Sequence, residues 1–337
     1  MEKMPKEESN EIDTKKTENN NNNTDNNYNI KLKELKLKLK YHNDIIWCSI
    51  LLKVGRIATG SDDNSIIIFN NKTFKPDLII KEHDWPVRCL IQLKSGILAS
   101  CSVDNIIKLY NIKEKEYQVI QTLNYHTKSV YKLIELNNNK LVSCSGDGNI
   151  IFYIKENNEY IKDYQFKTNG LNYCLIQTKE NKICFSEYKD DDDDEEYSIC
   201  FFDLIERKII TRINNIDCCL SFKMISKDLL MITGENKISI ANINSNNIIR
   251  KIDIPNSSYI YDVCMLNENQ LLTCDYNKNI IQWKIEGDNL ILISKKENAH
   301  DKYIITLLKI GDGNVLSGDG DGYIKILYYS KENIIGH

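Results

Sequence analysis

Four groups of residues recur at identical offsets along this 337-residue chain, and such an internal repeat strongly limits its possible folds. Each copy begins with a histidine, has Ser or Thr at the seventeenth position onward and Asp at the twenty-first, and ends an Ile-rich run six positions later. The copies are His42, Thr59, Asp63 and Phe69; His83, Ser100, Asp104 and Tyr110; His126, Ser143, Asp147 and Tyr153; and His300, Ser317, Asp321 and Leu327. One structural unit is therefore used repeatedly.

Three weaker copies complete the series. They end at Phe202, Ala241 and Trp283, and the last of them has Thr273 at the hydroxyl position and Asn277 at the turn position. The seven residues that end the repeats are spaced 41, 43, 49, 39, 42 and 44 positions apart. Short apolar or alternating runs separated by Asn, Asp and Gly fill the intervals, which is typical of strands and turns. The sequence predicts an all-β fold of seven units.

This pattern resembles WD40 repeats from residue 30 to about residue 330. Residues 98–111 hold a Ser-rich strand, an Asp turn and, at Tyr110 and Asn111, the place of the family's Trp-Asp pair. The resemblance implies a seven-bladed β-propeller. It also implies that each His bonds the Asp of its repeat, and that the hydroxyl and the closing ring, such as Tyr153 or Trp283, extend this network. Blades closed by Phe69 or Leu327 should have shorter networks, because these side chains carry no donor.

The two ends of the chain differ from the repeats. Residues 30–40 alternate apolar and polar side chains, with an interruption near Glu34, and predict a strand that completes the last blade beside residues 323–328. Residues 1–29 are acidic and Asn-rich and predict a disordered tail. Residues 331–337 form a short C-terminal tail in this interpretation, so the propeller spans 30–330.

Composition excludes several classes of protein. The net charge of −4 provides no basic footprint, which disfavours nucleic-acid binding. The apolar runs are too short for a membrane span. No signal peptide is apparent in residues 1–29, and the eleven cysteines indicate buried thiols in a reducing compartment. We therefore expect a cytoplasmic or nuclear protein, or one found in both.

Residues suited to catalysis are few. Four of the five histidines occupy the repeat position and the fifth, His337, is the last residue. Cys101, Cys144 and Cys274 share one repeat position, which is typical of packing residues, and the chain has no C-x-x-C motif. The sequence thus predicts no metal, no cofactor and no enzymatic activity.

The resemblance implies a binding surface at one mouth of the central channel. It places there the residues three and five positions after each His and the residue before each Asp. Trp, Tyr and Arg, which are enriched at binding hot spots, are frequent in this set. The predicted partner-binding residues are Trp47, Asp62, Arg88, Tyr131, Tyr173, Tyr259, Tyr261, Tyr276 and Tyr303. The alternative interpretation is that several of them are packing residues of the inner strands.

These observations favour a non-catalytic scaffold or adaptor. It would bind protein or peptide partners through the loops that precede the first strand of each blade and those between its second and third strands. One alternative is a substrate receptor of a cullin-type ubiquitin ligase, because residues 98–113 approximate the docking box of such proteins, with Tyr110, Asn111 and Lys113 in place of Trp, Asp and Arg. A ribonucleoprotein or ribosome-assembly factor is a further alternative.

One acidic insertion bears on these alternatives. Seven consecutive acids, Asp190–Glu196, are expected in the turn between the second and third strands of the fourth blade, on the same face. We expect this turn to be solvated and mobile. It would repel phosphates, which disfavours RNA, and it either steers a basic partner or is a neutral insertion.

Overall fold

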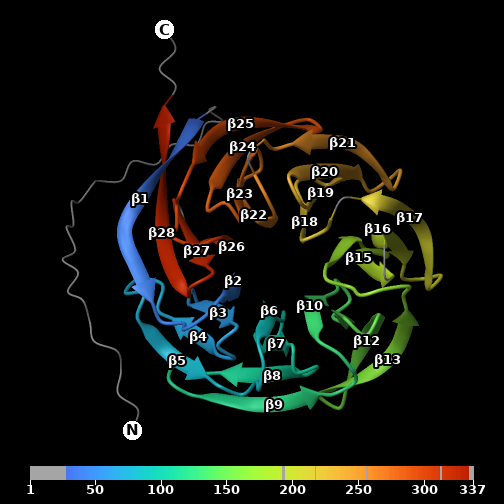
Figure 1. Cartoon of the computed structure of the whole chain (residues 1–337). Helices are drawn as coiled ribbons and strands as arrows, with labels where there is room; N and C mark the ends of the chain where they lie inside the picture. Colours follow the sequence, from blue (N-terminus) through green and yellow to red (C-terminus); the bar gives the residue numbers. More distant parts are fainter. Residues whose placement is uncertain (1–27, 192–193, 217, 256, 312, 334–337) are drawn as a thin grey trace.

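Each repeat contributes to a four-stranded antiparallel sheet, and seven such sheets surround a central axis in the computed structural model of the chain (Figure 1). The structure describes residues 28–191, 194–216, 218–255, 257–311 and 313–333. All regular elements within these ranges are strands. A helix long and apolar enough to cross a membrane is absent from the described ranges. The predicted seven-bladed β-propeller is confirmed.

The strands follow one another from the axis outward in each blade, and the blades follow the chain around the ring (Figure 1). Blades 1 to 3 comprise β2 (Ile46–Leu51), β3 (Ile57–Ser61), β4 (Ile66–Phe69) and β5 (Pro76–Ile80); β6 (Val87–Gln92), β7 (Leu98–Ser102), β8 (Ile107–Ile112) and β9 (Tyr117–Leu123); and β10 (Val130–Glu135), β11 (Leu141–Ser145), β12 (Asn149–Glu156) and β13 (Glu159–Lys167). Blades 4 to 6 comprise β14 (Leu175–Lys179), β15 (Lys182–Asp191), β16 (Asp194–Asp203) and β17 (Lys208–Ile216); β18 (Ser221–Met224), β19 (Leu229–Thr233), β20 (Lys237–Asn242) and β21 (Asn247–Asp253); and β22 (Ile260–Asn267), β23 (Gln270–Asp275), β24 (Ile280–Glu286) and β25 (Asn289–Lys296). Blade 7 comprises β26 (Ile304–Lys309), β27 (Asn314–Asp319), β28 (Tyr323–Asn333) and β1 (Tyr28–Lys40).

Blade 7 closes the ring with strands from both ends of the described chain. β1 pairs antiparallel with β28, from Lys40 opposite Tyr323 to Tyr28 opposite Asn333. The register shifts between Glu34 and Lys38, where the apolar alternation of the sequence is interrupted. The predicted closure by residues 30–40 is confirmed, and both strands extend past the expected limits. The other residues of the predicted tails, 1–27 and 334–337, lie outside the described residues.

The apolar core lies between neighbouring blades. One buried cluster joins Cys101 and Leu109 of blade 2 to Leu133 and Tyr153 of blade 3. Another joins Ile57 of blade 1 to residues of blade 7. A single repeat cannot bury both faces of its sheet, so each blade depends on its neighbours for its core. All eleven cysteines are free thiols, and all are buried except the half-buried Cys48.

A buried histidine joins two loops in each of blades 1 to 3. The ring Nδ1 lies 3.0, 2.7 and 2.9 Å from a carboxylate oxygen in the pairs His42–Asp63, His83–Asp104 and His126–Asp147. The ring Nε2 lies 2.7, 2.6 and 2.7 Å from the hydroxyls of Thr59, Ser100 and Ser143. Because a carboxylate only accepts, Nδ1 donates to it, and Nε2 of the neutral ring accepts from the hydroxyl. The loop before each blade is thereby fixed to the turn after its second strand.

The ring at the end of the repeat decides how far this network extends. Tyr110 and Tyr153 place their hydroxyls 3.2 and 3.1 Å from Ser100 and Ser143, respectively. In blade 6, Trp283 Nε1 donates to Thr273 Oγ1 at 3.0 Å. Blades 1 and 7 have Phe69 and Leu327 at this position. There the hydroxyl lies near a backbone oxygen instead, at 3.5 Å for Thr59 and Ile67 and 3.4 Å for Ser317 and Lys325.

The prediction for the carboxylate of blade 7 was wrong. His300 Nδ1 bonds Asp319 at 2.9 Å rather than Asp321, and its Nε2 bonds Ser317 at 2.7 Å. Asp319 follows Ser317 by two positions on β27, so both side chains point to the same side of the strand and reach the ring together. In the first three blades a serine stands at this position. Asp275 of blade 6 occupies it too, at 2.9 Å from Ser257.

We expect Asp319→Ala to lower the free energy of unfolding by about 1–3 kcal/mol, because it removes a buried acceptor from His300. Asp319 also accepts from the backbone amides of Asp321 and Tyr323, at 3.0 and 2.8 Å. Asp321→Ala, at a half-buried turn position, should change stability by less than about 0.5 kcal/mol. Urea unfolding of both variants measures the difference. An equal loss of unfolding free energy in the two variants would contradict this prediction and would favour Asp321 as the partner of His300.

Acid should destabilise the propeller through the same carboxylates. Burial raises the pKa of Asp104, but the hydrogen bond from His83 and the attraction to its ring together lower the pKa by a larger amount. The net pKa is therefore below the ordinary value. A carboxylate with a lowered pKa stabilises the fold above its unfolded pKa of about 3.9, and this contribution is lost as pH falls through the folded pKa. The urea midpoint of Asp104→Asn should therefore fall less than that of the natural protein below about pH 4. Parallel pH profiles would contradict this role.

Candidate functional site

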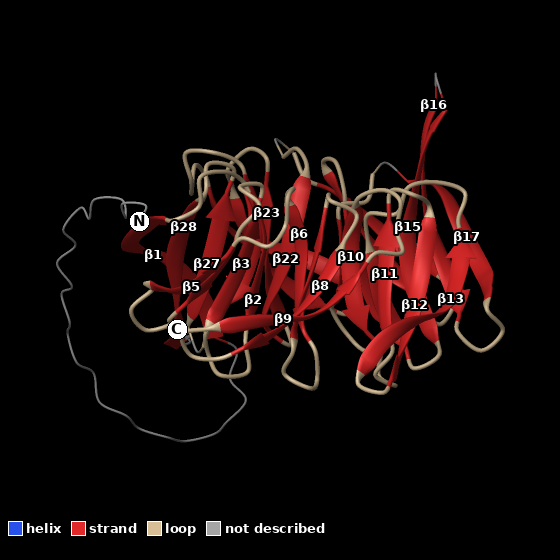
Figure 2. Ribbon diagram, turned by 90° about the horizontal axis from the view of Figure 1, so that it is seen from below, coloured by secondary structure: helices blue, strands red, loops and turns tan. Residues whose placement is uncertain are grey.

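A β-bulge near the start of the inner strand displaces one residue from the regular ladder in blades 1, 2, 3, 6 and 7. In blade 1, Ile46 pairs with Ser61 and Cys48 pairs with Gly60, so Trp47 stands between two paired residues. The corresponding residues of blades 2, 3, 6 and 7 are Arg88, Tyr131, Tyr261 and Ile305. A bulge redirects a side chain out of the regular ladder. We call the side of the ring that carries the histidine loops and the turns after the second strands the histidine face; it is uppermost in Figure 2.

The bulge residues of blades 1 to 3 form a continuous row with Tyr173 of blade 4. The guanidinium carbon of Arg88 lies 3.4 Å from the centre of the Trp47 ring and 5.6 Å from that of Tyr131. Tyr131 in turn lies 4.6 Å from Tyr173, which precedes β14. Four residues of four blades, Trp47, Arg88, Tyr131 and Tyr173, thus meet at the histidine face, and we call them the arginine row. Each is half-buried, so the row keeps surface that a partner can cover.

Asp62 holds the first member of this row. Trp47 Nε1 donates a hydrogen bond to Asp62 Oδ1 across the β2–β3 pair. Burial raises the pKa of Asp62 more than the Trp47 hydrogen bond and the charge of Arg88 lower it. Burial likewise lowers the pKa of Arg88. Among the described residues no carboxylate lies within ion-pair distance of the Arg88 guanidinium.

The remaining predicted residues gather in blades 6 and 7. The rings of Tyr276 and Tyr303 stack, with centres 5.0 Å apart and planes 9° apart. Tyr261 lies 6.4 Å from Tyr303, and Tyr259 meets Tyr276 edge-on at 6.4 Å. We call these four residues the tyrosine cluster. Gly320 makes room for it, because a Cβ there would lie 2.6 Å from the Tyr303 ring.

The structure adds two aromatic residues that the repeat offsets missed. Tyr188 and Tyr197 pair across β15 and β16, with ring centres 4.6 Å apart, and Tyr188 lies 6.1 Å from Tyr173. They extend the arginine row within blade 4. Their signal in the sequence was their position on either side of the acidic run. Two members of the expected series are instead core residues, since Cys219 and Ile305 are only 1% and 4% exposed.

The acidic run lies between the second and third strands of blade 4, as expected, and its described residues extend those strands rather than forming a turn outside them. β15 and β16 continue their ladder through Asp190 opposite Glu195 to Asp191 opposite Asp194. Residues 192–193 lie outside the described residues. Figure 2 shows β16 projecting beyond the other blades on the histidine face. The insertion therefore lengthens a regular hairpin, because the flanking residues, including the Tyr188–Tyr197 pair, already hold the two strands in register.

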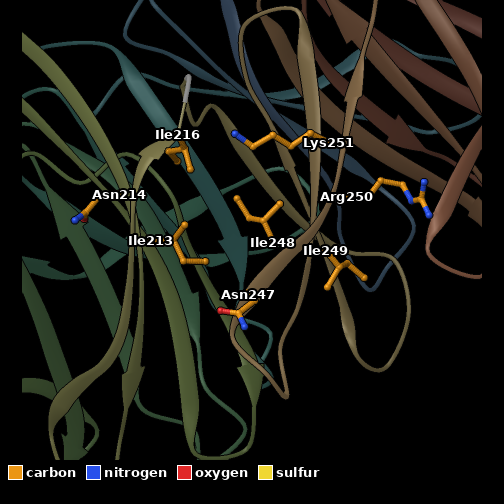
Figure 3. Close-up of a pocket in the computed structure, with 8 residues that line it drawn as sticks. All are labelled: Ile213, Asn214, Ile216, Asn247, Ile248, Ile249, Arg250 and Lys251. Carbon is orange, nitrogen blue, oxygen red and sulfur yellow. The ribbon is translucent and has the colours of Figure 1, made fainter.

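A groove on the outer wall offers a second surface. It has a volume of about 540 Å³ and lies between the outer strands β17 and β21 of blades 4 and 5 (Figure 3). The lining residues are Ile213, Asn214, Ile216, Asn247, Ile248, Ile249, Arg250 and Lys251. Its lining carries two cations and no carboxylate, so it contains no acid–base pair. It is remote from the bulge residues and serves below as a control surface.

Groups suited to metal binding or catalysis are few in the described part of the chain. Its four histidines are buried in the loop network, and no three His, Cys, Asp or Glu side chains gather there as a metal ion would require. His337 lies outside the described residues. In the segment that approximates a cullin-adaptor box, Asn111 and Lys113 are exposed, and Lys113 pairs with Glu116 at 2.6 Å.

Comparison with known proteins supports the family suggested by the repeat. The family model for the WD domain, G-beta repeat matches residues 74–111 and 117–153. Each match spans the outer strand of one blade and the three inner strands of the next, so it covers one repeat as the chain encodes it. No curated protein sequence matches the chain significantly. Two matched repeats within a ring of seven four-stranded blades identify the chain as a WD40-repeat protein.

Proposed function

We propose that this protein is a non-catalytic scaffold or adaptor that binds protein or peptide partners through its histidine face. WD40 propellers are generally protein-interaction scaffolds. The observation that supports this face is the concentration of half-buried or exposed Trp, Tyr and Arg side chains on it, in the arginine row and the tyrosine cluster. Such side chains bury large areas on binding and retain a polar group for specificity.

The way the face is built also supports binding. The bulge residues of blades 1 to 3 sit on strands whose entry loops are fixed by buried histidines, so their positions are set before a partner arrives. A surface that is already ordered loses little conformational entropy on association. The exposed carboxylates of the face, which include Asp44 and Glu235, disfavour the ribonucleoprotein alternative because they repel phosphates.

The combined substitution Trp47→Ala, Arg88→Ala and Tyr261→Ala should remove co-purifying partners. Truncation of a central Trp, Tyr or Arg anchor often costs 2 kcal/mol or more, so we expect recovery to fall at least about tenfold. The measurement is affinity purification of the tagged protein from its own cells, with folding checked by circular dichroism and thermal unfolding.

The matched control is Ile213→Ala, Ile248→Ala and Ile249→Ala in the outer groove, which should leave the partners in place. Loss of partners from the control alone would move the binding surface to the outer wall. Partners that survive both variants but disappear with Asn111→Ala and Lys113→Ala would favour the ubiquitin-ligase alternative.

A further inference from the structure

Two of the four residues in the tyrosine cluster are exposed to solvent. Tyr259 and Tyr276 are 38% and 47% exposed, and the stacked pair Tyr276–Tyr303 joins blades 6 and 7. Tyr261 adds a third ring from the bulge of β22. The faces of an aromatic ring carry negative potential, so several of them together attract a cation.

Several aromatic rings elsewhere in the described part of the molecule lie against cations of the same chain. Arg88 lies against Trp47 and Tyr131, and other Lys or Arg side chains lie over the rings listed here: Lys38 and Lys40 over Tyr323, Lys162 over Tyr125, and Arg207 over Tyr164. Within the described residues none lies over a ring of the tyrosine cluster. The rings of the tyrosine cluster could therefore contact a cation that comes from another molecule.

Carboxylates surround the cluster on several sides. Glu235 of blade 5 forms a β-bridge with Tyr259, and its negative charge raises the pKa of Tyr259 more than burial does. Glu195 of the projecting hairpin contributes in the same direction. Burial is the largest cause that raises the pKa of Tyr303, and the neighbouring Tyr276 raises it as well. The charges of Asp44, Asp62 and Asp321 act in the same direction. Five acids from blades 1, 4, 5 and 7 thus act on two rings.

We propose that the tyrosine cluster receives a lysine or arginine side chain of the partner, and that the partner segment on the histidine face is basic. This inference rests on the proposed binding function of that face. Two lysines, the half-buried Lys278 and the exposed Lys302, flank the cluster in sequence, but neither lies over its rings. The surrounding acids outnumber them, so the charge of the site complements a cation.

The projecting hairpin would serve the same partner. Its sequence carries seven consecutive acids, and the ladder between β15 and β16 holds it as a hairpin on the histidine face. A charge of one sign at the rim of a site increases the encounter rate with an oppositely charged partner, and salt weakens this effect. Binding should therefore weaken as ionic strength rises.

The test uses the purified full-length protein and short fluorescein-labelled peptides. One probe alternates Gly with Lys, a second alternates Gly with Arg, and a third alternates Gly with Glu. Fluorescence anisotropy should show saturable binding of the two basic probes at low ionic strength and none of the acidic probe. Binding of the acidic probe with equal affinity would overturn the proposal.

Two pairs of substitutions separate the rings from the charges. Tyr276→Leu with Tyr303→Leu keeps apolar bulk but removes the aromatic faces, and should weaken the basic probes about fivefold, as expected for one cation–π contact of about 1 kcal/mol. Glu195→Gln with Glu235→Gln should also weaken them at least about threefold. The control pair Glu159→Gln and Glu268→Gln makes the same change of charge in turns on the opposite face, and should alter affinity less than twofold.

Equal weakening by the control pair would show attraction to net charge alone and would overturn the proposal. Unchanged affinity in the tyrosine pair would do the same. The proposed function is judged separately, by partners recovered from cells. If they are lost with the Trp47, Arg88 and Tyr261 substitutions while no basic probe binds, the histidine face remains the binding surface and its partner is not basic.

Discussion

The hydrogen bond between a buried imidazole and a carboxylate of the same repeat connects the two kinds of loop that form the histidine face. One loop enters a blade and the other turns between its second and third strands, and without the connection each would be an independent surface loop. The pairing of partly buried polar groups fixes one geometry, because any other arrangement would leave a donor or acceptor without a partner. This network also orders the bulge residues Trp47, Arg88 and Tyr131, because each lies five positions after the histidine of its repeat.

The seven equivalent positions of the ring hold different residues, and the face is asymmetric as a result. Blades 1 to 3 place Trp47, Arg88 and Tyr131 at the bulge, and a guanidinium bridges two rings there. On blades 6 and 7 four tyrosines gather among acids, and no cation of residues 28–333 that the structure describes lies over them. A pseudo-symmetric framework thus carries two chemically distinct halves. Repeat architecture fixes the spacing of the contacts, while the degenerate residues give them their specificity.

Most of the fold could be predicted from the sequence, because the fixed spacing of the repeat residues reflects the lengths of the strands and turns in each blade. The ring closure was also visible, since residues 30–40 needed a partner strand and their interrupted alternation at Glu34 coincides with a shift in register. The exchange of Asp321 for Asp319 was not visible, because both lie near one turn and only the direction of the strand shows which side chain reaches His300. Burial of Ile305 and exposure of Tyr276 depend on neighbouring blades, which spacing alone does not describe.

The pairing of β1 with β28 sets an order of events during synthesis. About 280 residues separate Lys40 from Tyr323, so at roughly 5–20 residues per second β1 waits about 15–60 s for its partner on the ribosome. During this interval it is an isolated strand exposed to other nascent chains. Apolar residues and lysines alternate in its sequence, as Ile-Lys-Leu-Lys over residues 30–33 and Leu-Lys-Leu-Lys over residues 37–40. The strand therefore carries a positive charge at nearly every second position. Such charges oppose pairing between identical strands, so the segment that closes the ring is also protected against premature association.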